Sequence, residues 1–312
     1  MGNDQKLARD LVKTTEVEEN ILTNKEIAHL FIHHNKVLTS HLLPGLDVKT
    51  EERKDGVKVD IVLKENTVIK RPVHLCFGML PKEGVQRIIL RADIKRNSKI
   101  SVLAHCAFPN AVNVKHIMDG KIKVREEAEY SYFERHIHGK EGGVKVYPKA
   151  LIELGRGAKF KTEFELLKGR VGLIDIDYQT TCGEKSVMEM NARINGTGDD
   201  VIKIKESGFL QGEYSRGVLT SRVALRDRAR AEIYNKMTAT AAYARGHVDC
   251  KEIVQDKGFA SAIPVVEVKH PKAHVTHEAA IGSVDTKQLQ TLMSRGLSED
   301  EAVELIIQGL LS

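Results

Sequence analysis

The sequence contains no tryptophan, and only 5% of its residues are aromatic. Proteins that bind nucleic acid commonly gather Lys and Arg on one surface and add aromatic side chains on which bases stack. Here 48 basic residues are interspersed with 43 acidic ones, so the net charge of +5 is small for 312 residues. The composition therefore argues against a nucleic-acid groove and favours a mixed, solvated surface.

Cysteine pairs and long apolar runs are also missing. The four cysteines include no C-x-x-C pair, which excludes a zinc ribbon and offers no disulfide framework. No apolar run approaches the roughly 20 residues that a membrane-spanning helix needs. The N-terminal residues are polar and lack the apolar core of a secretory signal. We therefore predict a cytoplasmic protein without a membrane segment.

The common catalytic and nucleotide-binding motifs are absent as well. The glycines at 155, 157, 196 and 198 lack the spacing and the Lys-Ser/Thr of a phosphate-binding loop. His277-Glu278 does not open an H-E-x-x-H zinc motif, because the fifth residue is Ile281. The chain thus shows no nucleotide site of its own, and any dependence on ATP would come from a partner.

Apolar periodicity divides the chain into three parts. Apolar residues three and four apart, from Leu7 to Leu38, predict helices over residues 4–43. From Val57 the apolar period changes to two, which is typical of half-buried strands, and no helical run interrupts it up to about residue 280. The predicted parts are an N-terminal helical region (1–56), a β-domain (57–284) and a C-terminal helical segment (285–312).

A weak repeat runs through the β-domain. A small residue opens a strand at Ser98, Ala128, Ala158 and Ser186, in steps of 30, 30 and 28 residues. The signature returns 43 and 44 residues further on, which would fit pairs of coils of about 22 residues. Self-similarity of this length with strands alone predicts a β-helix, in which stacked coils bury one row of side chains. A β-sandwich is the alternative, since its strands alternate in the same way.

The last part contains clear helix signals. Asp285 can cap one helix, Gly296 can end it, and Ser298 with Glu301 forms a capping box for the next. The final helix is apolar on more than one stripe. It either docks deeply on the β-domain or offers its second face to a partner.

Three residues near the C-terminal end could hold a metal. Cys250, His277 and Glu278 supply a thiolate, an imidazole and a carboxylate, a mixed set that iron accepts. The polar neighbours of Cys250 indicate a thiol near a surface or interface, although a free cysteine is more often a small buried hydrophobe. Along a regular strand His277 and Glu278 point to opposite faces. Both could reach one metal only if the chain bends there or if two copies meet.

Other sulfur and imidazole groups carry weaker signals. We predict structural burial for Cys106 and Cys182. His136 and His138 share one strand face and could bind metal, but their place before Gly139 and Gly142 favours simple solvation.

Several motifs in the second half resemble the SufB/SufD family of Fe–S cluster assembly scaffolds, in the short form typical of archaea. They are Ser221-Arg-Val-Ala-Leu-Arg-Asp-Arg-Ala-Arg-Ala-Glu232, Ala244-Arg-Gly-His-Val-Asp-Cys250, His270-Pro-Lys-Ala-His-Val-Thr-His-Glu-Ala-Ala-Ile-Gly-Ser-Val-Asp285 and Met293-Ser-Arg-Gly-Leu-Ser-Glu-Asp-Glu-Ala302. The resemblance implies a right-handed parallel β-helix and a scaffold rather than an enzyme. It also implies sulfur transfer from an entry cysteine along the β-helix, for which neither Cys106 nor Cys182 is a secure match.

The resemblance further implies a site and partners. Cys250, His277 and Glu278 match the family's ligand positions for a transient Fe–S cluster at the interface between two scaffold subunits, here a homodimer through the end of the β-helix. Thr276 departs from the acidic residue expected in longer members. The expected partners are a SufC-like ABC-type ATPase, bound through residues 285–312, and recipient apoproteins. A metal-dependent β-helix enzyme and an adaptor solenoid remain the alternatives.

Overall fold

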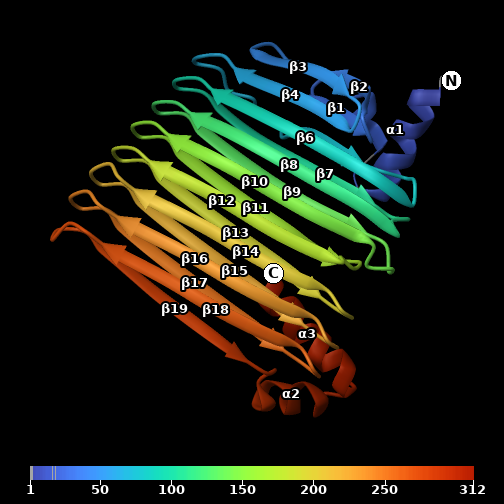
Figure 1. Ribbon diagram of the computed structural model, residues 1–312, viewed down its shortest axis with the longest axis vertical. Coiled ribbons are helices and arrows are strands. Elements are labelled where there is room, and N and C mark those ends of the chain that lie inside the picture. Colours follow the sequence, from blue (N-terminus) through green and yellow to red (C-terminus); the bar gives the residue numbers. More distant parts are fainter. Residues whose placement is uncertain (1–2, 16, 18) are drawn as a thin grey trace.

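A computed structural model, which describes residues 3–15, 17 and 19–312, shows the chain wound into a parallel β-solenoid (Figure 1). From β4 (Gly56–Leu63) onward successive strands alternate between two sheets, so each coil adds one strand to both. Strands of neighbouring coils pair in parallel, and this confirms the predicted β-helix over the antiparallel sandwich. The coils stack in chain order from the N-terminal helix to the C-terminal helices.

Among the described residues one sheet has ten strands and the other nine. In spatial order, the ten-stranded sheet contains β19 (His274–Gly282), β17 (Arg245–Val254), β15 (Arg216–Leu225), β13 (Val187–Gly196), β11 (Lys159–Lys168), β9 (Glu129–His138), β7 (Lys99–Phe108), β5 (Val73–Gly78), β1 (His29–His33) and β2 (Lys36–His41). The nine-stranded sheet contains β18 (Phe259–Val268), β16 (Arg230–Ala239), β14 (Val201–Leu210), β12 (Leu173–Cys182), β10 (Val144–Leu154), β8 (Asn113–Val124), β6 (Glu83–Ile94), β4 (Gly56–Leu63) and β3 (Leu46–Arg53).

The register shows a nearly constant coil length and corrects one expectation. Val187 pairs with Arg216, and Arg216 pairs with Arg245, so each of these coils takes 29 residues. The steps of 43 and 44 residues are therefore one and a half coils rather than two coils of 22. The signature at Ala229 precedes β16 in the nine-stranded sheet, whereas its neighbours in the repeat precede strands of the ten-stranded sheet.

The small residues of the repeat lie at inner corners of the coils. The residue before each corner has a left-handed backbone, with φ of 53° at Asn97, 54° at Glu127 and 56° at Lys185. The backbone then turns inward, and the next side chain is almost fully buried, as at Ala128 and Ser186. A larger side chain there would meet the neighbouring coils, which explains why the sequence repeats a small residue.

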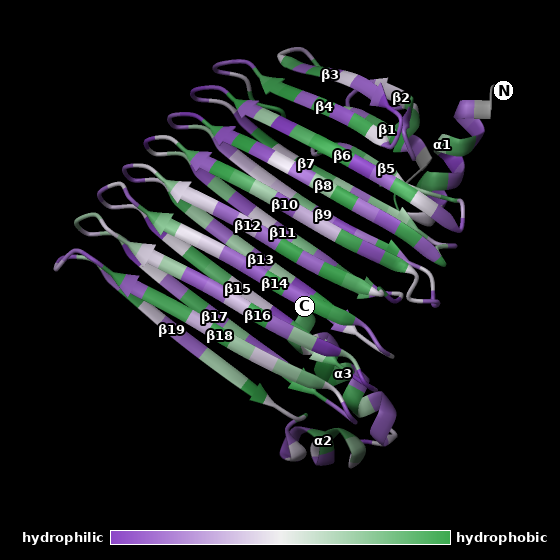
Figure 2. Ribbon diagram, viewed as in Figure 1, coloured by the Kyte–Doolittle hydropathy of each residue, from purple (hydrophilic) through white to green (hydrophobic). Residues whose placement is uncertain are grey.

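Alternation along the strands builds the core. In β12 the inward residues from Ile174 to Cys182 are buried, and the residues between them are half exposed. Figure 2 shows the corresponding alternation of hydrophobic and hydrophilic residues along many strands. The interior is one continuous apolar column, interrupted by buried polar groups at a few coils.

At the N-terminal end the structure corrects the predicted helical region. Helix α1 (Asn3–Thr14) and the short 3-10 helix η1 (Glu19–Leu22) are the helices among the described residues there, whereas residues 29–41 form β1 and β2. The apolar run Leu30-Phe31-Ile32 is buried on both faces of β1: Leu30 and Ile32 face the solenoid core, and Phe31 packs with the cluster that includes Leu11 of α1. A strand buried on both faces shows no alternation, so its run reads like part of a helix.

At the C-terminal end the predicted helix signals are confirmed. Asp285 caps α2 (Thr286–Met293), Gly296 has a φ of 98°, and Ser298 forms the capping box of α3 (Glu299–Leu311). Helix α3 lies on the outer face of the ten-stranded sheet, where Ile307 and Leu311 pack around Ala224 of β15. Helix α2 buries none of its residues and lies beside α3 (Figure 1).

The last coil leaves the solenoid open. Strands β18 and β19 have no further neighbours in their sheets, and most residues of β19 are exposed. Their inward rows are largely apolar, with Ala260, Ala262 and Val266 on β18 and with Val275 and Ile281 on either side of His277 on β19. Ile281 is 48% exposed, so the end of the core faces solvent.

Candidate metal centre

Cys250 belongs to the buried inward row of β17. Its side chain is fully buried in the single chain, so the thiol is not at a surface, although β17 is one strand from the edge of its sheet; the alternative of an interface stays a prediction. The polar neighbours that suggested exposure, Asp249 and Lys251, point to the outer face because side chains alternate along the strand. Nδ2 of Asn235, on β16, donates to the Cys250 Sγ over 3.7 Å. Burial raises the pKa of the Cys250 thiol, which favours the protonated form in the metal-free chain.

A second inward residue of β17, Glu252, was missed by the sequence reasoning. Its carboxylate is buried, and Oε1 accepts a hydrogen bond from Ser221 Oγ over 3.3 Å, while Oε2 has no partner among the described residues. Burial raises the pKa of Glu252 to about 7. The signal was its spacing of two residues from Cys250, which places both on one strand face.

The structure brings His277 to the face of Cys250 but keeps Glu278 on the other. His277 pairs with Val248, whose side chain is buried inward, and Glu278 pairs with Asp249. Both β19 residues are exposed, and the Glu278 carboxylate lies 3.5 Å from Lys251 Nζ on the outer face. Within one chain the three predicted residues therefore do not converge on a common point, as the alternation rule anticipated.

The described residues contain a different group with converging metal-binding atoms, formed by Cys106 of β7, His116 of β8 and Glu134 of β9. Cys106 Sγ lies 3.7 Å from His116 Nε2 and 3.8 Å from Glu134 Oε1. All three side chains are buried inside the solenoid. The predicted burial of Cys106 and Cys182 is thus confirmed, but sequence reasoning did not connect Cys106 with partners 10 and 28 residues away.

His136 and His138 extend this polar cluster. Both are buried, which corrects the prediction that they are solvated. His136 Nε2 lies 2.8 Å from Glu134 Oε1, and His136 Nδ1 lies 3.2 Å from His138 Nε2. They belong to β9 itself rather than to the following loop, so the strand's inward alternation carries them into the core.

Burial shifts the groups of the cluster toward their uncharged forms. It raises the pKa of Glu134 to about 7 and that of the Cys106 thiol well above its ordinary value. It lowers the pKa of His116 to about 3. The neutral imidazole can bind a metal directly, whereas the thiol and any protonated carboxyl must first release their protons.

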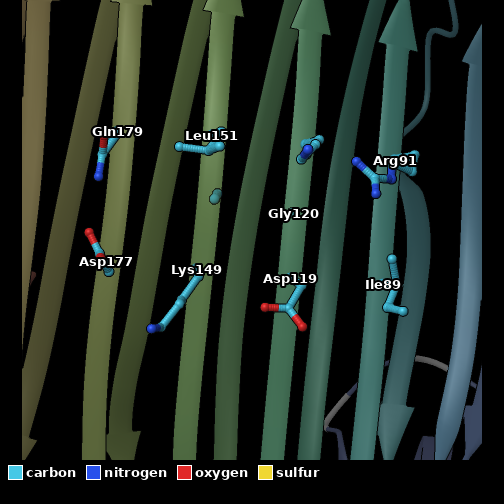
Figure 3. Close-up of a pocket in the computed structure, with 10 residues that line it drawn as sticks. Ile89, Arg91, Asp119, Gly120, Lys149, Leu151, Asp177 and Gln179 are labelled. Atoms are coloured by element: carbon cyan, nitrogen blue, oxygen red, sulfur yellow. The ribbon is translucent and has the colours of Figure 1, made fainter.

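A hollow on the outer face of the nine-stranded sheet contains no comparable ligands. Figure 3 shows Arg91, Asp119, Lys149 and Asp177 around it, contributed by neighbouring strands of the sheet. Positive and negative side chains are mixed, and neither a thiol nor an imidazole lines the hollow. The two thiol sites inside the solenoid are therefore the stronger metal candidates.

The fold and these sites define a parallel β-solenoid with thiol and imidazole groups in its interior and an open C-terminal end. No helix among the described residues is long and apolar enough to cross a membrane. Comparison with known proteins identifies a family with this sequence. Residues 84–310 match the family model described as SUF system FeS cluster assembly, SufBD core domain.

Relatives extend the match over nearly the whole chain. An iron–sulfur cluster assembly SufBD family protein of Pyrococcus horikoshii is 37% identical over 97% of this chain and 92% of its own length. One from Methanocaldococcus jannaschii is 35% identical over 96% of this chain and 94% of its own length. The iron–sulfur cluster assembly protein SufB of Bacillus subtilis is 38% identical over 22% of this chain and 15% of its own length. The chain therefore belongs to the SufBD family, and its family role is in Fe–S cluster assembly.

Proposed function

We propose that this chain is a scaffold subunit on which Fe–S clusters are assembled and from which they pass to apoproteins, with ATP hydrolysis supplied by a SufC-like ABC-type ATPase. The observation that carries the proposal is the inward row of the last coils. That row places the Cys250 thiol and the His277 imidazole on one sheet face, directly before the open end of the solenoid.

The open end supports assembly as a homodimer. Two strand edges and a small apolar surface are uncovered there, and both features favour pairing with another chain. A two-fold axis at this end would double every ligand, so that two thiolates could share one cluster. Glu278 lies on the outer face of an edge strand, so in such a dimer it could contact residues of the second copy.

The chemistry of the ligand set suits a transient cluster. Imidazole and carboxylate ligands can replace thiolates at iron, and a cluster with few thiolates is held less firmly than one with four. The buried Cys250 thiol must lose its proton to bind iron, since burial raises its pKa. Glu252, buried on the same row, is a further carboxylate within this part of the interior.

The C-terminal helices support docking of the ATPase. Ile307 and Leu311 fix α3 to the solenoid, but Leu305 on α3 is 47% exposed and Met293 on α2 is 41% exposed. A hollow lies between the two helices and is lined by Leu292, Leu305 and Ile306 together with polar residues. An exposed apolar surface on a helix pair is typical of a protein-binding site.

Anaerobic reconstitution with ferrous iron and sulfide tests the scaffold function. We expect the wild-type chain to form a visible Fe–S chromophore in a fixed ratio to protein dimer. Cys250→Ser should abolish it, whereas Cys182→Ser, which changes an equally buried thiol elsewhere in the core, should retain it. Transfer is then measured by activation of an added apoferredoxin. A normal chromophore in Cys250→Ser would contradict the assignment.

A further inference from the structure

The interior cluster of Cys106, His116 and Glu134 lies several coils away from the open end. The three residues come from β7, β8 and β9, so both sheets contribute, and their metal-binding atoms lie within 4.8 Å of one another. We propose that these three side chains form a second, mononuclear site for a divalent metal ion such as Zn²⁺ or Fe²⁺. The proposal does not depend on the cluster site at Cys250.

The distances suit a tetrahedral ion. With metal–sulfur and metal–nitrogen bonds of about 2.3 and 2.0 Å, the sulfur and nitrogen ligands of a tetrahedral site lie about 3.5 Å apart. Cys106 Sγ lies 3.7 Å from His116 Nε2 and 3.8 Å from Glu134 Oε1. Shifts of a few tenths of an ångström would bring these two pairs to the spacing of ligands on one ion, and all ligand atoms of the group lie within 4.8 Å of one another.

Surrounding side chains already orient the carboxylate. His136 Nε2 lies 2.8 Å from Glu134 Oε1, and Tyr178 OH donates to Glu134 Oε2 over 3.3 Å. The Tyr178 contact engages the oxygen that does not face Cys106, and a contact of this kind fixes the direction of a metal-binding carboxylate. The His116 ring has less support: its Nδ1 has no partner among the described residues, and the thiol is the polar contact of its Nε2. A metal ion at Nε2 would give this buried imidazole the strong interaction that it lacks.

The charges also balance. A thiolate, a carboxylate and a neutral imidazole carry a total charge of −2, so a divalent ion makes the buried site neutral. Without the ion, burial keeps Cys106 protonated and raises the pKa of Glu134 to about 7. Metal binding therefore releases the Cys106 proton and any proton on Glu134, and we expect affinity to rise as the pH increases.

One coordination position is left for a further ligand. Three protein ligands leave a tetrahedral ion with one open site. A water molecule is the simplest fourth ligand.

Cobalt binding tests the proposal in the full-length chain carrying Cys250→Ser, which removes the thiol of the cluster site. After treatment with a chelator, the protein is titrated anaerobically with Co²⁺. We expect one equivalent to bind, with a near-ultraviolet sulfur-to-cobalt charge-transfer band and the intense visible bands of tetrahedral Co²⁺. Zn²⁺ and Fe²⁺ added in competition should each remove these bands, and their relative affinities identify the preferred ion.

Variants locate the site. Adding Cys106→Ser should abolish the charge-transfer band, whereas adding Cys182→Ser, at another buried cysteine, should leave it unchanged. Glu134→Gln preserves the shape of the side chain and should weaken Co²⁺ binding at least tenfold, with circular dichroism showing that the solenoid is intact. No charge-transfer band, a band that survives Cys106→Ser, or unchanged affinity in Glu134→Gln would each overturn the proposal. Because the background lacks Cys250, these outcomes are separate from success or failure of cluster reconstitution.

Discussion

Cys250 and His277 lie on the same inward face of the ten-stranded sheet, because His277 pairs with Val248, two residues before the cysteine. Glu278 follows His277 directly and therefore lies on the outer face with Asp249. A single chain thus presents two of the three proposed cluster ligands on one side of an edge strand and the third on the other. Cluster binding by all three requires a second copy or a local change in β19.

The role of Glu278 can be tested against a matched carboxylate. Glu278→Ala and His277→Ala should each reduce the cluster yield on reconstitution several-fold or more, because each removes one ligand from every copy. Glu189→Ala is the control, since Glu189 is also an exposed outer-face carboxylate of the ten-stranded sheet near a lysine, Lys161. Yields are measured from iron and sulfide bound per protein. A normal yield in Glu278→Ala would restrict the ligands to the inward row of Cys250 and His277.

Pairing at the open end leads to a second prediction. Ile281 belongs to the inward row of β19 and is 48% exposed, so Ile281→Asp places a charge in the proposed interface. We expect the variant to be a monomer, as measured by light scattering during size-exclusion chromatography, and to lose cluster assembly. The control is Leu151→Asp, at a residue 51% exposed on the outer face of β10. If Ile281→Asp remains dimeric, the chains pair elsewhere.

The strands were predictable because their pattern is local. Alternation with period two and small corner residues follow directly from coil stacking, and both are visible in the sequence around Ser98, Ala128 and Ser186. The helix caps at Asp285 and Ser298 were predictable for the same reason, since each depends on residues only three apart. Strand β1 was misread because burial on both faces removes the alternation that identifies a strand.

The interior sites could not be predicted in the same way. Cys106, His116 and Glu134 come together through coil stacking and the approach of two sheets, and no fixed short spacing reports that contact. Cys250 was predicted to lie near a surface because its sequence neighbours are polar. On a strand, however, those neighbours point to the opposite face and do not report the environment of the cysteine itself. The pair Cys250 and Glu252 could have been found by applying the period of two within the strand.

Helices α2 and α3 give a third prediction, on partner binding. Leu305→Asp changes an exposed apolar residue beside the hollow between the helices, so it should weaken co-purification with the SufC-like ATPase at least tenfold while leaving α3 docked. Deleting residues 285–312 should abolish the complex, although it also uncovers the apolar contact around Ala224. Val112→Asp, at an exposed apolar residue far along the solenoid, is the control. A complex that survives both changes would place the docking surface elsewhere.

The buried carboxyl of Glu206 gives the last prediction, which concerns stability and pH. Glu206 lies inside β14, its Oε2 has no partner among the described residues, and burial raises its pKa to about 8. An unfolded glutamate has a pKa of about 4.3, so between these values the unfolded chain loses a proton that the folded chain keeps. The free energy of unfolding therefore falls as the pH rises through this range.

The buried histidines also make stability depend on pH, but they do so in a different pH range from Glu206. Burial lowers the pKa of His116 and His136 to about 3, so these residues affect stability below the unfolded value of about 6.5. Between about pH 6.5 and 8 the buried carboxyls dominate. We expect Glu206→Gln, which cannot ionise, to be more stable than the wild type at pH 8 by about 1–3 kcal/mol, with a flatter dependence on pH. Urea unfolding at several pH values measures this difference, and Glu232→Gln, at an exposed position of β16, is the control. If the free energy of unfolding depends on pH in the same way in Glu206→Gln and the wild type, Glu206 is ionised in the folded chain. The interior would then have to stabilise its charge.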